Sequence, residues 1–203
     1  MDHNTNNKAI EIVVYYLNLI KSETENLTHL AISKGSANYL VRQTVRQLNL
    51  PRDSYRLSVE AKKTWDSISS KEIFEYWYTN PVTSENPSKI VVPIYKGARK
   101  LPDEMRTLNK GDKFHFRQVF HDDHIIPIKL IMKKLLELKD PDYENVTDIL
   151  KDMSVCRMLK EEDRRIKEKS SRVYNEKEII ENLYMKEYGI EIVNYNYTLK
   201  NNE

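Results

Sequence analysis

Two histidines and two aspartates stand next to one another at residues 121–124, and an apolar segment follows them directly. The local sequence reads Phe-His-Asp-Asp-His-Ile-Ile-Pro over residues 120–127. Four side chains of this kind beside a buried strand cost free energy unless they share a metal ion, share a proton or face solvent. Carboxylates are hard oxygen ligands for Mg²⁺, and a neutral imidazole, with an intrinsic pKa of about 6.5, can accept a proton near neutral pH. Unless it is a solvated bend, this segment therefore indicates metal-assisted or acid–base chemistry.

The elements on either side of this cluster determine which of its side chains can act together. An aromatic strand precedes the cluster, and the extended chain is expected to continue through residues 125–128. Apolar residues at helical spacing predict a helix over 129–138 and, after a stop at residues 140–142, a short helix over 145–151. A short apolar strand at 155–159 leads into a charged helix that begins at Lys160. The predicted order is strand, intervening segment, strand and polar helix.

This order, together with the sequence Asp123-His124-Ile-Ile-Pro, resembles the HNH nucleases, a family built on a ββα-metal finger. In such a finger two strands and a helix jointly clasp one divalent cation. The resemblance covers about residues 113–169, which is under a third of the chain. It implies that Asp123 is a metal ligand, that His124 is the general base on a bent strand, and that Asn145 braces the loop between the strands.

The second metal ligand is expected on the polar helix. In the family this position is held by a His or an Asn, and sometimes by an acid, so the resemblance implies Asp163. Glu162 and Glu161 are the alternatives, because Asp163 departs from the more common residue types. The intervening segment is longer than in a minimal finger, and no pair of cysteines flanks it. His121 and Asp122 remain open as extra ligands, as a supporting pair or as part of a solvated bend.

The resemblance also implies an activity. It predicts an endonuclease that hydrolyses double-stranded DNA to 5′-phosphate and 3′-hydroxyl ends, with one Mg²⁺ or Mn²⁺ ion per active site and no organic cofactor. A small, free-standing chain of this type looks similar to type II restriction enzymes. That likeness implies site-specific cleavage by a homodimer, because a two-fold protein matches a two-fold DNA site. A homing or toxin nuclease and a non-catalytic DNA-binding regulator are the alternatives.

Basic residues outside the cluster are candidates for DNA contact. A helix is predicted over 36–48, and residues 26–48 could form a helix-turn-helix with its turn at 34–36. Arg42 and Arg46 would then reach base edges, although a plain helical bundle is the simpler interpretation. Phosphate contacts are expected from a basic linker and from the polar helix. The alternative is that both are simply solvent-exposed surfaces, which carry the same residue types. The candidates there are Arg99, Lys100, Arg164 and Arg165.

The remaining sequence predicts further helices and strands around the finger. An amphipathic helix is expected over 8–21, a third helix over 70–79 after a cap at Ser69 or Ser70, and a loop at the domain boundary over 80–88. A strand is expected over 90–95, and a helix over 175–188 is expected to end at Gly189 before a strand over 190–193. The tyrosines of this last segment are expected to pack its layer or a dimer interface. They stand at 184, 188, 195 and 197.

The predicted fold class is α+β, in three consecutive parts. A helical N-terminal region at 1–80 could contact DNA, a nuclease core is expected at 88–172, and a C-terminal helix and strand at 173–203 would serve packing or dimerisation. Both element types are needed, because the metal finger combines strands with a helix while the sequence before residue 50 has helical spacing alone.

The composition limits the class of protein. The chain has 203 residues, of which 39% are apolar and 32% charged, so it can form a compact core. A net charge of +2 does not exclude DNA binding, which depends on one basic face. Cys156 is the one cysteine, which excludes an internal disulfide and fits a reducing, cytoplasmic location. The N-terminus lacks a signal-peptide pattern, and the apolar run at 12–20 is too short to span a membrane.

Overall fold

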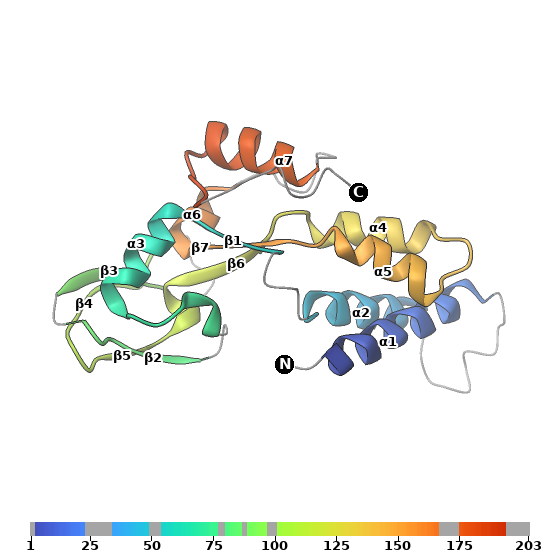
Figure 1. Cartoon of the computed structure of the whole chain (residues 1–203), viewed down its shortest axis with the longest axis horizontal. Helices are drawn as coiled ribbons and strands as arrows, with labels where there is room; N and C mark the ends of the chain where they lie inside the picture. Colours follow the sequence, from blue (N-terminus) through green and yellow to red (C-terminus); the bar gives the residue numbers. More distant parts are fainter. Residues whose placement is uncertain are drawn as a thin grey trace. The chain divides into compact units, whose positions relative to one another are not determined.

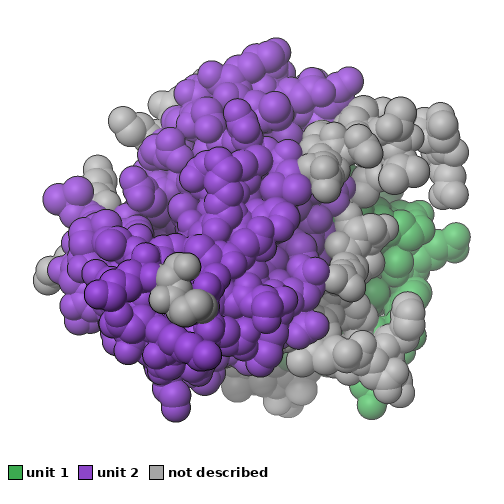
Figure 2. All heavy atoms as spheres, turned by 60° about the vertical axis from the view of Figure 1, so that its left-hand side comes forward, with its two compact units in different colours: residues 1–54, 126–154 green, residues 55–125, 155–203 purple. Residues whose placement is uncertain are grey.

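The computed structural model divides the chain into two compact units, each assembled from segments that are distant in sequence (Figures 1 and 2). Unit 1 comprises residues 1–54 and 126–154, and unit 2 comprises residues 55–125 and 155–203. The structure describes residues 3–22, 34–48, 54–76, 80–86, 89–96, 101–166 and 175–193. Helices and three small sheets in these residues confirm the α+β class. The division differs from the three consecutive parts expected from the sequence, because the segment between the two finger strands belongs to unit 1.

Unit 1 is a bundle of helices. It contains α1 (His3–Lys21), α2 (Lys34–Arg46), α4 (Ile128–Glu137) and α5 (Tyr143–Lys151), of which α1 contacts α2 and α5, and α4 contacts α2 and α5 (Figure 1). Each helix buries an apolar stripe, as the spacing predicted. The buried residues include Val13, Leu17, Val41, Val45, Ile131, Leu135, Val146 and Leu150. The amide of Asn18 donates to the carbonyl of Pro141 at 2.9 Å, which ties α1 to the connection between α4 and α5.

The turn expected at residues 34–36 is wrong, because these residues form the first turn of α2. A glycine costs a helix about 1 kcal/mol, which the buried stripe of α2 offsets, so Gly35 does not interrupt it. Residues 26–33, the expected first helix of a helix-turn-helix, lie outside the described residues.

The central sheet of unit 2 has the strand order β1-β7-β6. Strand β1 (Tyr55–Leu57) runs parallel to β7 (Val155–Leu159), and β6 (Phe120–His124) runs antiparallel to β7. The β6–β7 register is continuous from Phe120 opposite Leu159 to His124 opposite Val155. Helix α6 (Lys160–Arg165) follows β7 without a loop. The predicted order of two strands and a polar helix is confirmed, with α4 and α5 inserted between the strands.

Helix α3 (Val59–Ile68) packs on this sheet, whereas the sequence interpretation had expected a helix eleven residues later, over 70–79. The Ser58 hydroxyl caps its start by accepting from the Ala61 amide at 3.1 Å. Ser69 ends the helix instead of starting one, since its amide donates to the Trp65 carbonyl at 2.9 Å. Residues after it form only a short 3₁₀-helix, η3 (Ile73–Glu75). The prediction of a helix over 70–79 is therefore wrong for residues 70–76. Residues 77–79 lie outside the described residues.

Two β-ladders complete the core of unit 2. Strand β3 (Ile90–Ile94) pairs with β4 (Glu104–Leu108). Strand β3 confirms the strand that was predicted over 90–95. Strand β2 (Pro81–Thr83) pairs with β5 (Lys113–His115), so the loop expected over 80–88 is wrong at this point. Pro81 fits because it is the first residue of an edge strand. The expected aromatic strand is interrupted by the 3₁₀-helix η4 (Phe116–Gln118), which lets Phe116 and Phe120 stack with ring centroids 4.6 Å apart.

The C-terminal segment is a single helical run. Helix α7 (Glu176–Glu178) continues into the π-helix η5 (Ile179–Glu187), which confirms the helix predicted over 175–188. Gly189, at φ +63°, provides the left-handed conformation that ends it. The strand expected over 190–193 is reduced to one bridge between Ile192 and Ser58. Among the residues that the structure describes, no helix is long and apolar enough to cross a membrane.

Candidate metal centre

Three metal-ligating side chains come together in the described part of unit 2. They are His121 and Asp123 of β6 and Asp163 of α6, and one donor atom of each lies within 4.8 Å of the other two. The His121 Nε2 atom is 3.6 Å from the Asp163 carboxylate. All three side chains are half-buried, so the cluster has both a protein wall and access to solvent. One imidazole and two carboxylates form a donor set that suits Mn²⁺ and, through its oxygens, Mg²⁺.

The register of the finger explains why these residues meet. Side chains alternate between the two faces of a strand, so His121 and Asp123 share one face of β6. Because α6 begins directly at the end of β7 and contacts both strands, it brings Asp163 against the same face. The structure therefore unites Asp123 and Asp163, as expected, and adds His121, whose role the sequence left open.

The orientation of α6 distinguishes among its three acidic residues. Glu162 is 2% exposed and accepts hydrogen bonds from the Ser58 hydroxyl at 2.6 Å and from the Leu159 amide at 2.8 Å. Burial raises the pKa of Glu162, while these two donors act to lower it. Glu161 is exposed. Asp163 alone of the three belongs to the cluster, because successive helical residues point about 100° apart.

Asp122 belongs to the opposite face of β6, where it pairs with an arginine from β7. The Arg157 guanidinium is 1% exposed and donates to both oxygens of Asp122, at 2.7 and 2.8 Å. It also donates to the Ile73 carbonyl at 2.7 Å and lies 4.8 Å from the centroid of the Phe116 ring. The Arg157 side chain therefore connects β6 of the finger to the segment after α3. Asp122, whose role the sequence left open, has a structural role here.

Asp122→Ala is expected to destabilise the protein by about 3 kcal/mol, because it leaves the Arg157 charge buried without its carboxylate. The measurement is the free energy of unfolding from a denaturant titration. Asp148→Ala is the matched control, since Asp148 is paired with Lys151 on the exposed surface of α5 and should change stability by less than about 0.5 kcal/mol. Equal stability losses in the two variants would contradict the structural role.

His124, the expected general base, is the last residue of β6. The sequence interpretation placed it beside Asp123 on a bent strand so that both would face one phosphate. The regular register sends the two neighbouring side chains to opposite faces of β6, so a shared orientation depends on how the strand ends. The chain bends immediately afterwards, at Ile125 and Ile126, so the side chain of His124 stands at the end of the sheet.

A buried tyrosine that the sequence interpretation had assigned to packing touches the cluster. The Tyr184 hydroxyl of η5 donates to the Asp123 carboxylate at 2.5 Å, across 61 residues of sequence. Tyr184 is 0% exposed. Burial, followed by the charge of Asp123, raises the pKa of Tyr184 well above its ordinary value, so the phenol keeps its proton. No local pattern around residue 184 indicates this contact, because it depends on how η5 packs.

Asn145, the expected brace, is a helix-capping residue of unit 1. The backbone amide of Asn145 donates to the Asp142 carboxylate at 2.8 Å. In return, the side-chain oxygen of Asn145 accepts from the backbone amide of Asp142 at 3.1 Å. Its side-chain amide donates to the Asp140 carbonyl at 2.9 Å. These bonds fix the start of α5.

Basic side chains surround the second half of the finger. The Arg164 guanidinium lies 3.7 Å from the centroid of the Tyr95 ring, and the Lys160 ammonium lies 5.8 Å from it. Burial lowers the pKa of Lys160, and the nearby charges of Arg164 and Arg117 lower it further. Arg165 is exposed. The helix that carries Asp163 thus also carries three basic side chains, those of Lys160, Arg164 and Arg165.

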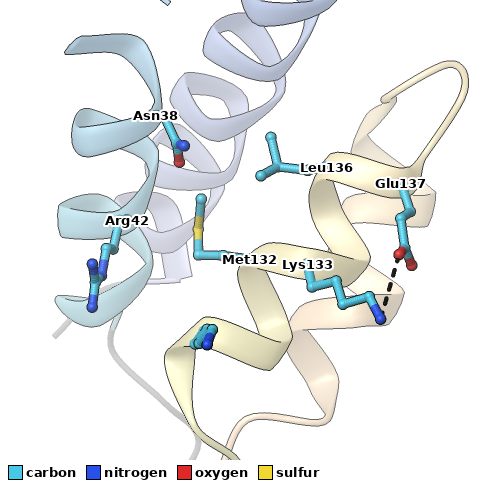
Figure 3. A pocket seen from close by; sticks show the side chains of 7 residues that line it. Asn38, Arg42, Met132, Lys133, Leu136 and Glu137 are labelled. Atoms are coloured by element: carbon cyan, nitrogen blue, oxygen red, sulfur yellow. Dashed lines mark ion pairs between the residues drawn. The ribbon is translucent and has the colours of Figure 1, made fainter. Parts of the chain in front are cut away.

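The other predicted DNA-contacting residues lie in unit 1 or outside the described residues. Arg42 lines a groove of about 550 Å³ between α2 and α4, with Met132 and Leu136 among its lining residues (Figure 3). Lys129 and Lys133 also line this groove, and Lys133 is 3.8 Å from Glu137. Arg46 is exposed near the end of α2. The last two candidates fall in the gap at 97–100. They are Arg99 and Lys100.

No family model, no curated protein and no solved structure matches this chain.

Proposed function

We propose that the chain is a metal-dependent DNA endonuclease of the HNH type. The observation that supports this proposal best is the convergence of His121, Asp123 and Asp163 on one side of a strand–strand–helix unit. Three protein donors leave positions open on an octahedral ion for water and for a phosphate oxygen. A bound Mg²⁺ or Mn²⁺ would neutralise charge on the phosphate and stabilise the leaving 3′ oxygen.

The protein residues divide the remaining work. His124 accepts a proton from water, the resulting hydroxide forms the new P–O bond, and the P–O bond to the 3′ oxygen breaks. The products are a 5′-phosphate and, after protonation, a 3′-hydroxyl. Arg164 and Lys160 contact the phosphate chain next to the break. Arg42 and Arg46 contact DNA from unit 1, and Arg165 adds a further exposed charge.

The test is a cleavage assay of the full chain on a mixture of linear and supercoiled DNA, with Mg²⁺, Mn²⁺ or a chelator, followed by sequencing of the ends. The proposal expects metal-dependent cuts with 5′-phosphate ends. A short, discrete recognition site would support a restriction enzyme, which is expected to be a homodimer, whereas a long site would support homing and unselective cutting a toxin. If the chain binds DNA but does not cut it with either metal, the nuclease proposal is overturned and the alternative of a non-catalytic DNA-binding regulator is supported.

Arg164→Gln is expected to weaken DNA binding measured in Ca²⁺. The slope of log K, the DNA association constant, against the logarithm of the salt concentration should fall in magnitude by about 1. The reason is that one charged phosphate contact disappears while a polar, uncharged side chain remains. Fluorescence anisotropy at several salt concentrations measures both quantities. Lys62→Gln is the control, because Lys62 is an exposed residue of α3 paired with Asp66. A salt slope equal to that of the wild type would remove Arg164 from the DNA contact.

A further inference from the structure

The C-terminal helical run supplies the candidate metal centre with a fixed hydrogen-bond donor. The Tyr184 hydroxyl reaches one oxygen of Asp123, Oδ2, at 2.5 Å. The charges of Asp123 and, to a smaller extent, Asp163 add to burial in raising the pKa of this tyrosine. The segment at 175–193 is therefore connected to the finger through a ligand side chain, and not only through apolar packing.

The position of this hydroxyl is strongly determined. Tyr184 is fully buried in η5 next to Ile180 and Leu183, which are also buried. Its backbone carbonyl accepts from the Ile190 amide at 2.7 Å, where the chain turns at Gly189. π-Helical segments are rare and occur frequently at functional sites. Here the π-helix carries the tyrosine that reaches Asp123.

A hydrogen bond of this kind has a definite consequence for a metal ligand. A carboxylate has two oxygens and a rotatable side chain, so a free aspartate can bind an ion in several ways. A neutral donor on Oδ2 restricts this rotation. It also reduces the repulsion between two carboxylates that lie within a few ångströms of each other. Outer partners of this type change metal affinity by about 10–100-fold when they are removed.

We propose that Tyr184 is a positioning residue of the metal centre, holding Asp123 so that one carboxylate oxygen is directed to the ion. This inference rests on the proposed function, because it takes Asp123 to be a metal ligand. It makes the C-terminal helical run part of the active site and not a separate packing layer.

The experiment compares Mn²⁺ affinity in the wild-type chain, Tyr184→Phe and Tyr76→Phe, by isothermal titration with DNA absent. Tyr184→Phe is expected to raise the Kd for Mn²⁺ about 10-fold or more and to lose cleavage at low metal, with recovery at saturating metal. Tyr76→Phe is the matched control, because Tyr76 packs on Trp65 in the core of unit 2, with ring centroids 4.8 Å apart. It should bind Mn²⁺ as the wild type does. Thermal unfolding checks that both variants fold.

The possible outcomes separate this inference from the function on which it rests. A wild-type chain that binds no Mn²⁺ overturns the proposed metal centre and this inference with it. Wild-type binding with an unchanged Kd in Tyr184→Phe overturns the positioning role alone. If Tyr184→Phe fails to fold, 3-fluorotyrosine inserted at position 184 provides a second measurement. Its ¹⁹F resonance should shift with Mg²⁺ at the midpoint of metal binding, and a resonance that does not move overturns the inference.

Discussion

Asp163→Asn is expected to lower metal-dependent DNA cleavage by about 10³-fold or more. Asparagine keeps the size of the side chain and removes its negative charge, so the ion loses one of two carboxylate ligands. Mn²⁺ affinity should fall together with the cleavage rate, because the defect lies in holding the ion. Single-turnover cleavage and isothermal titration of Mn²⁺ measure the two quantities.

The matched control for this prediction is Glu161→Gln, on the same helix. Glu161 is an exposed carboxylate two residues before Asp163 and is not among the three gathered donors. It should cut DNA at the wild-type rate. If Asp163→Asn cleaves normally while Glu161→Gln does not, the second ligand has been assigned to the wrong residue of α6. Glu162 is a poor control, because its substitution breaks the bonds to Ser58 and Leu159 and affects stability.

His124→Ala is expected to reduce the cleavage rate by about 10²–10⁴-fold while leaving Mn²⁺ affinity unchanged. The side chain stands at the end of β6 and is not one of the three donors, so its removal takes away a base and not a ligand. Single-turnover cleavage at saturating metal gives the rate, titration gives the affinity, and electrophoretic retardation in Ca²⁺ should show that DNA binding is retained.

His121→Ala separates the two histidines of the finger. Because its imidazole belongs to the gathered donors, this variant should lose Mn²⁺ affinity and cleavage together. If instead His121→Ala binds Mn²⁺ normally but does not cut, and His124→Ala still cuts, then His121 is the base. That result would agree with the face of β6 on which each histidine lies.

Much of the finger could be predicted from local sequence. The apolar run at 155–159, the charged run after it and the aromatic residues before 120 have spacings that only one type of element can bury. The structure has β7 and α6 in the first two places, whereas the aromatic residues before 120 lie in β5 and η4, and β6 begins at Phe120. Helix α3 was missed because a serine can cap either end of a helix region. Which serine starts a helix depends on where the apolar stripe of Ala61, Trp65 and Ile68 is buried.

The candidate site was predictable in part for the same reason. Alternation along a strand is a property of the backbone, so the sequence alone determines that Asp123 shares a face with His121 and not with Asp122 or His124. The resemblance to the HNH motif instead paired Asp123 with the adjacent residue, His124, as metal ligand and general base. It also assigned Asn145 to the site, whereas the chain uses its side chain to cap α5.

The sequence by itself determined the polar cluster, the strands and helix that carry it, and the alternation of its side chains. Only the tertiary structure decided which face of β6 meets α6 and which is filled by Arg157. It also decided that a phenol 61 residues away donates to Asp123. The physical reason is that hydrophobic periodicity specifies a buried direction for each element but not the partner found there. That partner depends on how η3, η5 and the central sheet pack around one core.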